Sequence, residues 1–321
     1  MYCRRTKINI AHAIAMRMPS DHFPIAARRH RLRRISLWTA AALYTAALPY
    51  MILGFRAIDQ HFSPQIAANV PLLIIILLAV FYTIACVRKN MAVRGVIILA
   101  ASGLIVFFVM RFESNPNKYI HIPEYVLMTW ILYQALVLDY KGRGIMLLIL
   151  ICATMLGIVD ELLQGIHPQR TFGWKDLIID TASSFIGILT LMGVKRREPE
   201  DWLWLGRLKH FKLFLAAILC GALTAIPMCI YLFDVQVEGS FANIYPRWLL
   251  TLNGLFTAAT AALIVFFCSH RHRPDRPTST TDVNLSIHHT TALLWVMCPL
   301  AILFSMHALV VWVAVAGKEF R

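Results

Sequence analysis

The chain has 321 residues, 59% of them hydrophobic and 15% charged, and its formal net charge is +14. One soluble domain cannot bury that much apolar surface, so the composition excludes an ordinary soluble protein and predicts an integral membrane protein. A span needs about 20 mostly apolar residues to cross roughly 30 Å of hydrocarbon, and its backbone groups must pair within the segment. We therefore expect an all-α, polytopic helical bundle of about nine spans, at 36–56, 70–87, 92–111, 124–140, 144–164, 177–194, 212–233, 248–268 and 291–316.

The distribution of positive residues predicts the direction of the spans. With the N-terminus in the cytoplasm, 23 of the 31 Lys and Arg belong to the cytoplasmic side and 8 to the opposite side. Positive residues are retained on the cytoplasmic side during insertion. We therefore expect a cytoplasmic N-terminus and an external, periplasmic C-terminus.

The first 35 residues are strongly basic and include RRTK and ARRHRLRR. They lack the short apolar core and cleavage site of a secretory signal. A nucleic-acid-binding arm is one interpretation, but no aromatic residues are interleaved with the charges. We favour a topology anchor against anionic head groups, which predicts membrane lipids as partners and no nucleic acid.

The cysteines and the histidine-rich segments predict neither disulfides nor a metal site. No CxxC pair occurs, and SHRHRP (269–274) and HH (288–289) lack further ligands at fixed spacing. We expect a solvated loop around these histidines and assign no metal; the cofactor stays unknown. The cysteines are interpreted as small apolar packing residues: Cys3, Cys86, Cys152, Cys220, Cys229, Cys268 and Cys298.

Ionisable residues gather in VDELLQGIHPQRTFGWKDLIID (159–180) and in RFESNPNKYIHIPEY (111–125). The predicted topology places both connections on the external side. Asp160 and Gln164 are four residues apart, as are Asp176 and Asp180, so each pair shares one face of its helix. Ionisable groups at hydrocarbon depth are costly and normally face a bundle interior, a partner or a water-filled cavity.

Two interpretations of these residues remain open. In the first, Lys118, Arg170 and Lys175 neutralise the carboxylates in a purely structural ion-pair network. In the second, the carboxylates are in excess and, with His121 and His167, form a functional cavity at the outer leaflet.

Two stretches of this region resemble a known family. KYIHIPEY (118–125) resembles the K-x-x-H-x-x-x-Y element of the VanZ-like family of bacterial membrane proteins, and 160–187 resembles its D-E-x-x-Q…R…D-x-x-x-N element. Asp180 stands where the family usually has Asn, and Ser183 where it often has Gly. The matching residues are Lys118, His121, Tyr125, Asp160, Glu161, Gln164, Arg170, Asp176 and Gly187.

The resemblance covers about 91–194 and implies a division of the chain. We expect a basic cytoplasmic segment at 1–35, two accessory spans in 36–90, and a VanZ-like four-helix core at 91–194. Three further accessory spans follow in 195–321, with a cytoplasmic linker at 269–290.

The family is named for a protein linked to low-level teicoplanin resistance. The resemblance therefore implies a multi-pass protein of the bacterial inner membrane that confers glycopeptide tolerance, or modifies or exchanges head groups of envelope lipids, with a lipid-linked envelope substrate. We expect Glu161 as general base and His121 as general acid, with Asp160 and Asp176 completing the catalytic set. The expected substrate-binding residues are Lys118, Glu124, Tyr125, Gln164, Asp180 and Arg170, of which Arg170 clamps a phosphate.

Whether the protein is an enzyme stays open at this point. The main alternative is a non-enzymatic lipid- or antibiotic-binding or assembly protein with a structural ion-pair cluster; a proton-coupled transporter is a third. A divalent cation held by Asp160, Asp176 and Asp180 is a further possibility, with the ligand number open.

A single site makes two geometric predictions. His121 and Glu161 should lie within a hydrogen bond or one bridging water of each other. Arg170 should fold back to pair with Asp176 or Asp160, because it would otherwise leave submerged carboxylates uncompensated.

Overall fold

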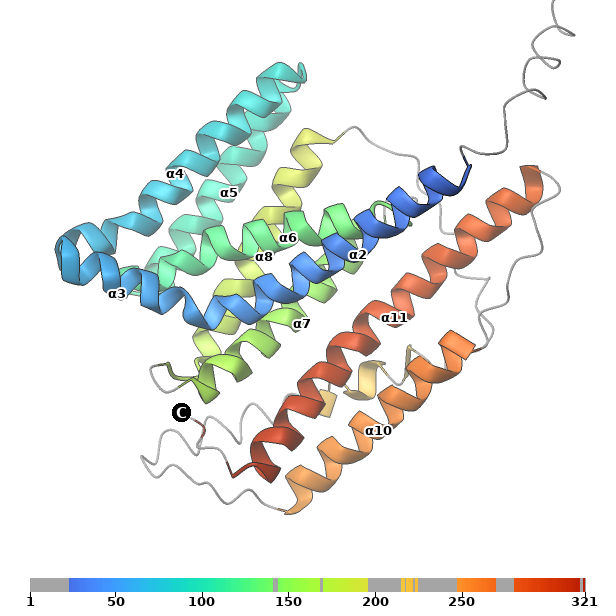
Figure 1. Ribbon diagram of the computed structural model, residues 1–321. Helices are drawn as coiled ribbons and strands as arrows, with labels where there is room; N and C mark the ends of the chain where they lie inside the picture. The colour runs from blue at the N-terminus through green and yellow to red at the C-terminus, as the bar shows by residue number, and fades with distance from the viewer. Residues whose placement is uncertain are drawn as a thin grey trace, which may run out of the picture.

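The computed structural model describes most of the chain: residues 23–140, 144–167, 170–195, 215–216, 218–221, 223–224, 247–269, 280–317 and 320. Every regular element within these residues is a helix. The helices are α2 (Phe23–Ala47), η2 (Leu48–Tyr50), α3 (Met51–His61), α4 (Pro64–Arg88), α5 (Ala92–Phe112), η3 (Pro116–Ile120), α6 (His121–Leu136), α7 (Ile145–Ile166), α8 (Trp174–Val194), α10 (Arg247–Ser269) and α11 (Thr280–Val315) (Figure 1).

Seven helices are long and apolar enough to cross a membrane, which confirms an all-helical, multi-pass architecture. They are Arg28–His61, Pro64–Arg88, Ala92–Phe112, Ile145–Ile166, Trp174–Val194, Arg247–Phe266 and Thr290–Val315. The expected span at 212–233 falls mostly outside the described residues. The count of nine spans therefore stays a prediction.

Helix α6 corresponds to the expected span at 124–140 but has only 16 residues. Eleven of these residues are buried, among them Tyr125, Met128 and Leu136. A short helix covered on most of its surface belongs to a bundle interior, where its length does not have to match the bilayer.

The core of the bundle consists of α6, α7 and α8. Tyr125, Leu148, Ile149 and Leu191 are fully buried there. Helices α6 and α8 approach closely at Gly187, where a Cβ atom would stand 2.6 Å from the Cβ of Thr129. Only a glycine allows the two backbones to come this near.

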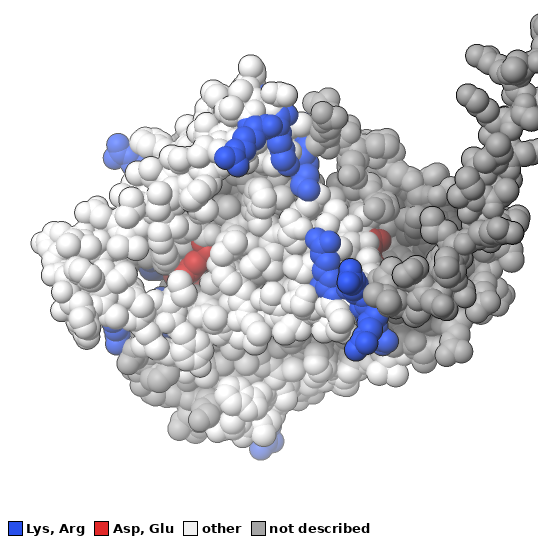
Figure 2. All heavy atoms as spheres, turned by 45° about the horizontal axis from the view of Figure 1, so that its top comes forward, with Lys and Arg blue, Asp and Glu red and all other residues white. Residues whose placement is uncertain are grey.

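Helices α4 and α5 flank this core and carry the lipid-facing surface. They run side by side at one edge of the molecule (Figure 1). Large apolar side chains are exposed on both, including Ile76 and Phe81 on α4 and Ile97 and Phe108 on α5. The face drawn in Figure 2 is mostly uncharged, with Lys and Arg in separate groups and few carboxylates. Contiguous apolar surface of this kind is expected where lipid is the solvent.

Helices α10 and α11 form a second antiparallel pair that joins the core through α11 and α7 (Figure 1). A buried polar contact links the pair, between His307 Nδ1 and Asn253 Oδ1 at 2.7 Å. Three of the four cysteines whose side chains are described, Cys86, Cys152 and Cys298, are buried and free, as expected; Cys220 is exposed.

Long-range contacts sort the helix ends of the core into two groups. At one end Arg34 of α2 pairs with Asp139, which follows α6. At the same end Lys89 Nζ donates to the Val194 carbonyl at 3.4 Å. The α7–α8 connection and η3 lie at the other end. This alternation agrees with the predicted order of spans from α2 to α8, while the side of the membrane that each end faces stays a prediction.

Candidate functional site

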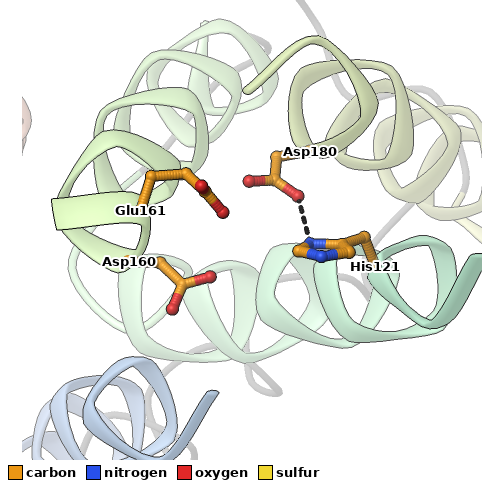
Figure 3. Close-up of side chains that lie close together, drawn as sticks. All are labelled: His121, Asp160, Glu161 and Asp180. Carbon is orange, nitrogen blue, oxygen red and sulfur yellow. Dashed lines mark hydrogen bonds and ion pairs between the residues drawn. The ribbon is translucent and has the colours of Figure 1, made fainter. Parts of the chain in front are cut away.

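Four ionisable side chains from three helices converge at one end of the core. His121 begins α6, Asp160 and Glu161 lie in the last turns of α7, and Asp180 lies near the start of α8. Each of them is exposed by 2% or less. Their potential ligand atoms all lie within 4.8 Å of one another, and the side chains point toward a common centre (Figure 3).

Helix geometry sets the depth of this cluster. Asp160 precedes the end of α7 by six residues, and Asp180 follows the start of α8 by six residues. At 1.5 Å per residue, both carboxylates lie about 9 Å inside their helices. Asp160 and Asp180 therefore lie within the apolar helices rather than at their ends, while their depth in a membrane stays a prediction.

The imidazole of His121 is held by Asp180. The Nδ1 atom lies 2.8 Å from Asp180 Oδ1, and the ring stacks on Tyr125 with centroids 6.4 Å apart. Gly157 of α7 packs against this arrangement, and a Cβ atom there would stand at van der Waals distance from Asp180, at 3.4 Å. Asp180 thus fixes the orientation of the ring.

Gln164 connects the α7 carboxylates to the hairpin. Its Nε2 donates to Asp160 Oδ2 at 3.0 Å and to Glu161 Oε1 at 2.8 Å. Its Oε1 accepts from Arg170 Nε at 2.9 Å and also from the Arg170 Nη2 atom. The Tyr125 hydroxyl adds a bond to Asp160 Oδ2 at 3.0 Å, and the Gly173 amide donates to Glu161 Oε2 at 2.9 Å.

A second charged group lies between η3 and the start of α8. Lys118 Nζ is 2.9 Å from Asp176 Oδ1 and 4.0 Å from Glu113 Oε2. The loop that carries Lys118 is fixed by the Tyr119 hydroxyl, which donates to the Glu113 carbonyl at 2.9 Å. Lys118 therefore joins the connection before α6 to the N-terminal turn of α8.

The predicted convergence is confirmed, with one correction. His121 and Glu161 lie within the reach of one bridging water. The predicted pairing of Arg170 with Asp176 or Asp160 is wrong. Arg170 does fold back, but it donates to the side-chain oxygen of Gln164, and Asp176 forms its salt bridge with Lys118 instead. Gln164 is nearer in sequence and offers a neutral acceptor, which needs no desolvation of a second charge.

The structural ion-pair network of the first interpretation is only partly formed. Lys175 lies over the Phe112 ring, 5.7 Å from its centroid. Within the described residues, no Lys or Arg forms a salt bridge with Asp160, Glu161 or Asp180. His167 is also outside the cluster, because its ring packs edge-on against Tyr50 at 5.2 Å.

A cavity of about 390 Å³ lies beside the cluster. Figure 2 shows a hollow in the surface with carboxylate atoms at its edge. The polar side chains that line the cavity come from the sequence-predicted site and its surroundings: Lys118, His121, Glu124, Gln164, Arg170 and Asp176, with Asn115, Asn117 and Thr171.

The opposite wall of this cavity was missed by the sequence analysis, which gave the helices of 36–90 no functional role. Helices η2, α3 and the first half of α4 supply it, with the apolar residues Leu48, Met51, Ile52, Phe55, Ile58, Val70, Pro71 and Ile74. Tyr44 of α2 also reaches this region, where its hydroxyl donates to the Glu124 carbonyl at 3.0 Å. No sequence motif marks the apolar wall, because any membrane span contains apolar residues of the same types.

All ten sequence-predicted site residues therefore belong to one region of the molecule, while the roles assigned to them stay predictions. Comparison with protein-family models, curated proteins and solved structures finds no match for this chain. The resemblance to the VanZ-like family accordingly rests on the residues quoted above and also stays a prediction.

Proposed function

We propose that this membrane protein binds the phosphorylated head group of a membrane lipid in the cavity between η3, α3 and α8, and modifies or exchanges that head group. The supporting observation is the division of one cavity into an apolar wall and a charged wall. An amphipathic ligand satisfies both walls at once, whereas a small polar solute would leave the wall of Met51, Phe55 and Ile58 without an apolar partner.

The cations of the charged wall suit a phosphate group. Lys118 and Arg170 both line the cavity, and each has donors left over after its contact with Asp176 or Gln164. An ammonium offers three donors and a guanidinium five, of which two can grip one phosphate. The Lys118 side chain is 31% exposed, so a ligand can reach it.

The chemistry on the head group would belong to the buried cluster next to the cavity. His121 lines the cavity and is also a member of the cluster, so it joins the two. Positioned, desolvated acid and base groups are common where bonds to a bound substrate are made or broken. Head-group transfer or removal at the outer leaflet, and glycopeptide tolerance as its consequence, are the forms of this proposal that the family resemblance suggests.

Lipid analysis tests the proposal directly. The full chain is purified in mild detergent, and co-purifying lipids are measured by mass spectrometry for the wild type, Arg170→Gln and Lys175→Gln. We expect Arg170→Gln to lose most of a specific phospholipid class. Lys175→Gln removes the same charge from a side chain that lies over the Phe112 ring and does not line the cavity, so this variant should retain that class. Equal lipid profiles in all three proteins would contradict the proposal.

A purely structural role for the cluster is the second candidate, favoured by the hydrogen bonds of Gln164 and by the Lys118–Asp176 pair, which tie neighbouring segments together. Cells that express wild type or Glu161→Gln separate the two candidates. If the protein folds normally with Glu161→Gln while envelope-lipid composition or teicoplanin tolerance reverts to that of cells without it, a structural role is excluded.

A further inference from the structure

The buried cluster has more negative groups than the protein neutralises. Asp160, Glu161 and Asp180 are exposed by 1% or less, and within the described chain none forms a salt bridge with Lys or Arg. Among the described residues, the one ionisable side chain that could carry a positive charge and contacts this group directly is His121, through Asp180. Buried carboxylates need a compensating charge, a proton or a metal ion.

Two carboxylate oxygens in the cluster are left without a hydrogen-bond partner. Asp160 Oδ1 and Asp180 Oδ2 are both buried atoms that accept no hydrogen bond. Their sister oxygens are fully engaged: Asp160 Oδ2 accepts from Tyr125 and Gln164, and Asp180 Oδ1 contacts His121. Buried acceptors are normally satisfied, so each of these two oxygens is available to a water molecule or an ion.

The separations fit one metal ion. Ligand atoms of His121, Asp160, Glu161 and Asp180 all lie within 4.8 Å of one another. Metal–oxygen and metal–nitrogen bonds of about 2.0–2.2 Å place ligands on opposite sides of an ion roughly 4.0–4.4 Å apart. Small side-chain rotations therefore close the cluster around a central ion.

The surroundings resemble an outer shell that holds metal ligands in place. Gln164 and the Gly173 amide fix the Glu161 carboxylate, Tyr125 and Gln164 fix one oxygen of Asp160, and Arg170 fixes Gln164. Outer-shell donors of this kind orient ligating carboxylates and tune the bound metal. They leave one oxygen of Asp160 and one of Asp180 without a hydrogen bond, and Figure 3 shows both carboxylate groups beside Glu161 and His121.

We propose that His121, Asp160, Glu161 and Asp180 bind one divalent transition-metal ion, of the Zn²⁺ or Mn²⁺ class. One imidazole nitrogen with three carboxylates suits these ions, whereas Ca²⁺ prefers six or more oxygens and Mg²⁺ retains most of its water. The two positive charges of the ion offset most of the negative charge of the cluster. The site does not depend on the proposed lipid chemistry.

The metal alone is the probe in the test. The full chain, purified without chelator, is analysed for metal by mass spectrometry, then stripped with EDTA and titrated with Zn²⁺ or Mn²⁺ while thermal unfolding is followed. We expect about one equivalent of metal per chain and a reversible rise of Tm on titration. Asp160→Asn and Asp180→Asn each should weaken the affinity by about 10-fold or more. Asp139→Asn, at the other end of the bundle, should leave the affinity unchanged.

The wild-type titration decides the proposal even if the Asn variants do not fold. No stoichiometric metal and no change of Tm with either ion would overturn it, and would show that protons neutralise the carboxylates. Metal binding that survives in folded Asp160→Asn and Asp180→Asn would also overturn it. Because lipid retention is measured separately, a failed metal site and a failed lipid site give different results.

Discussion

Two histidines are buried among the residues that the structure describes, and they look alike locally but differ in their surroundings. His121, 2% exposed, contacts Asp180 at 2.8 Å in the α6–α8 core. His307, 1% exposed, contacts Asn253 at 2.7 Å between α10 and α11 and stacks on Phe256 at 5.1 Å. Burial and one short polar contact are therefore common to both and do not by themselves mark a functional site.

The two regions differ in the number of charges and in access. His307 contacts the neutral amide of Asn253 and the ring of Phe256, and such contacts are sufficient to hold α10 against α11. His121 meets three carboxylates and a cavity that reaches cationic side chains. Only the arrangement around His121 places charged side chains beside a cavity that a ligand can enter. We therefore expect substitutions in the first region to change stability, and substitutions in the second to change function.

The largest expected effect separates the two histidines directly. Asn keeps a hydrogen-bond donor near the position of Nδ1, so His121→Asn and His307→Asn are matched variants. His121→Asn should lower the lipid-modifying activity on the order of 100-fold or more, because it removes a group next to the reacting atoms. His307→Asn should leave that activity within about twofold. Both are measured from lipid products in cells at equal protein level.

Equal activity in His121→Asn and wild type would mean that both histidines are structural. An equal loss in both variants, at normal protein level, would assign a functional role to the α10–α11 pair as well. Either result would end the distinction between the two regions.

The next effect concerns the polar connectors. Gln164→Leu removes the acceptor of Arg170 and one of the donors to each of Asp160 and Glu161, at about 1–3 kcal/mol for each lost hydrogen bond. Asn253→Leu leaves only His307 without its partner and should cost about 1–3 kcal/mol. Chemical denaturation in detergent should therefore show a larger loss for Gln164→Leu. A smaller loss there would indicate that water or an ion already satisfies the cluster.

A third pair of variants compares packing. A Cβ at Gly187 would meet Thr129 at 2.6 Å, whereas a Cβ at Gly254 of α10 meets nothing within 4 Å. Gly187→Ala should cost about 1–3 kcal/mol by overpacking the α6–α8 contact. Gly254→Ala should be neutral or slightly stabilising, since Ala is the better helix former. Similar thermal unfolding of both variants would contradict the close approach of α6 and α8.

The residue pattern predicted where most of the described helices lie in the chain, but their ends only to within several residues and the contacts between them less well. Spacings of three and four residues placed Asp160 and Gln164 on one face, and apolar run length located α4, α5, α7 and α8. Helical periodicity defines a face without naming the neighbour that covers it. For this reason the wall from α3 and α4 was missed.

The misassigned partner of Arg170 has a similar cause. Gln164, Asp160 and Asp176 are all acceptors within the reach of a long guanidinium side chain. The choice among them depends on differences of an ångström and on the position of Lys118, which arrives from a segment some 50 residues earlier. Charge counting along the chain predicted that compensation would occur but not which residues provide it.

The smallest effect on stability tests the cation of the charged wall. The Lys118–Asp176 pair is partly exposed on the lysine side, at 31% against 5% for the aspartate. Lys118→Gln should therefore cost only about 0–1 kcal/mol of unfolding free energy, as for other solvent-screened pairs. The same variant should retain clearly less phospholipid on purification, because it removes one of two cations that line the cavity.

Arg94→Gln is the matched control, since its only described polar contact is with the Lys195 carbonyl at the opposite end of the core. Loss of stability without loss of lipid in Lys118→Gln would make this pair a helix-joining contact like that of His307, and would remove Lys118 from the lipid site.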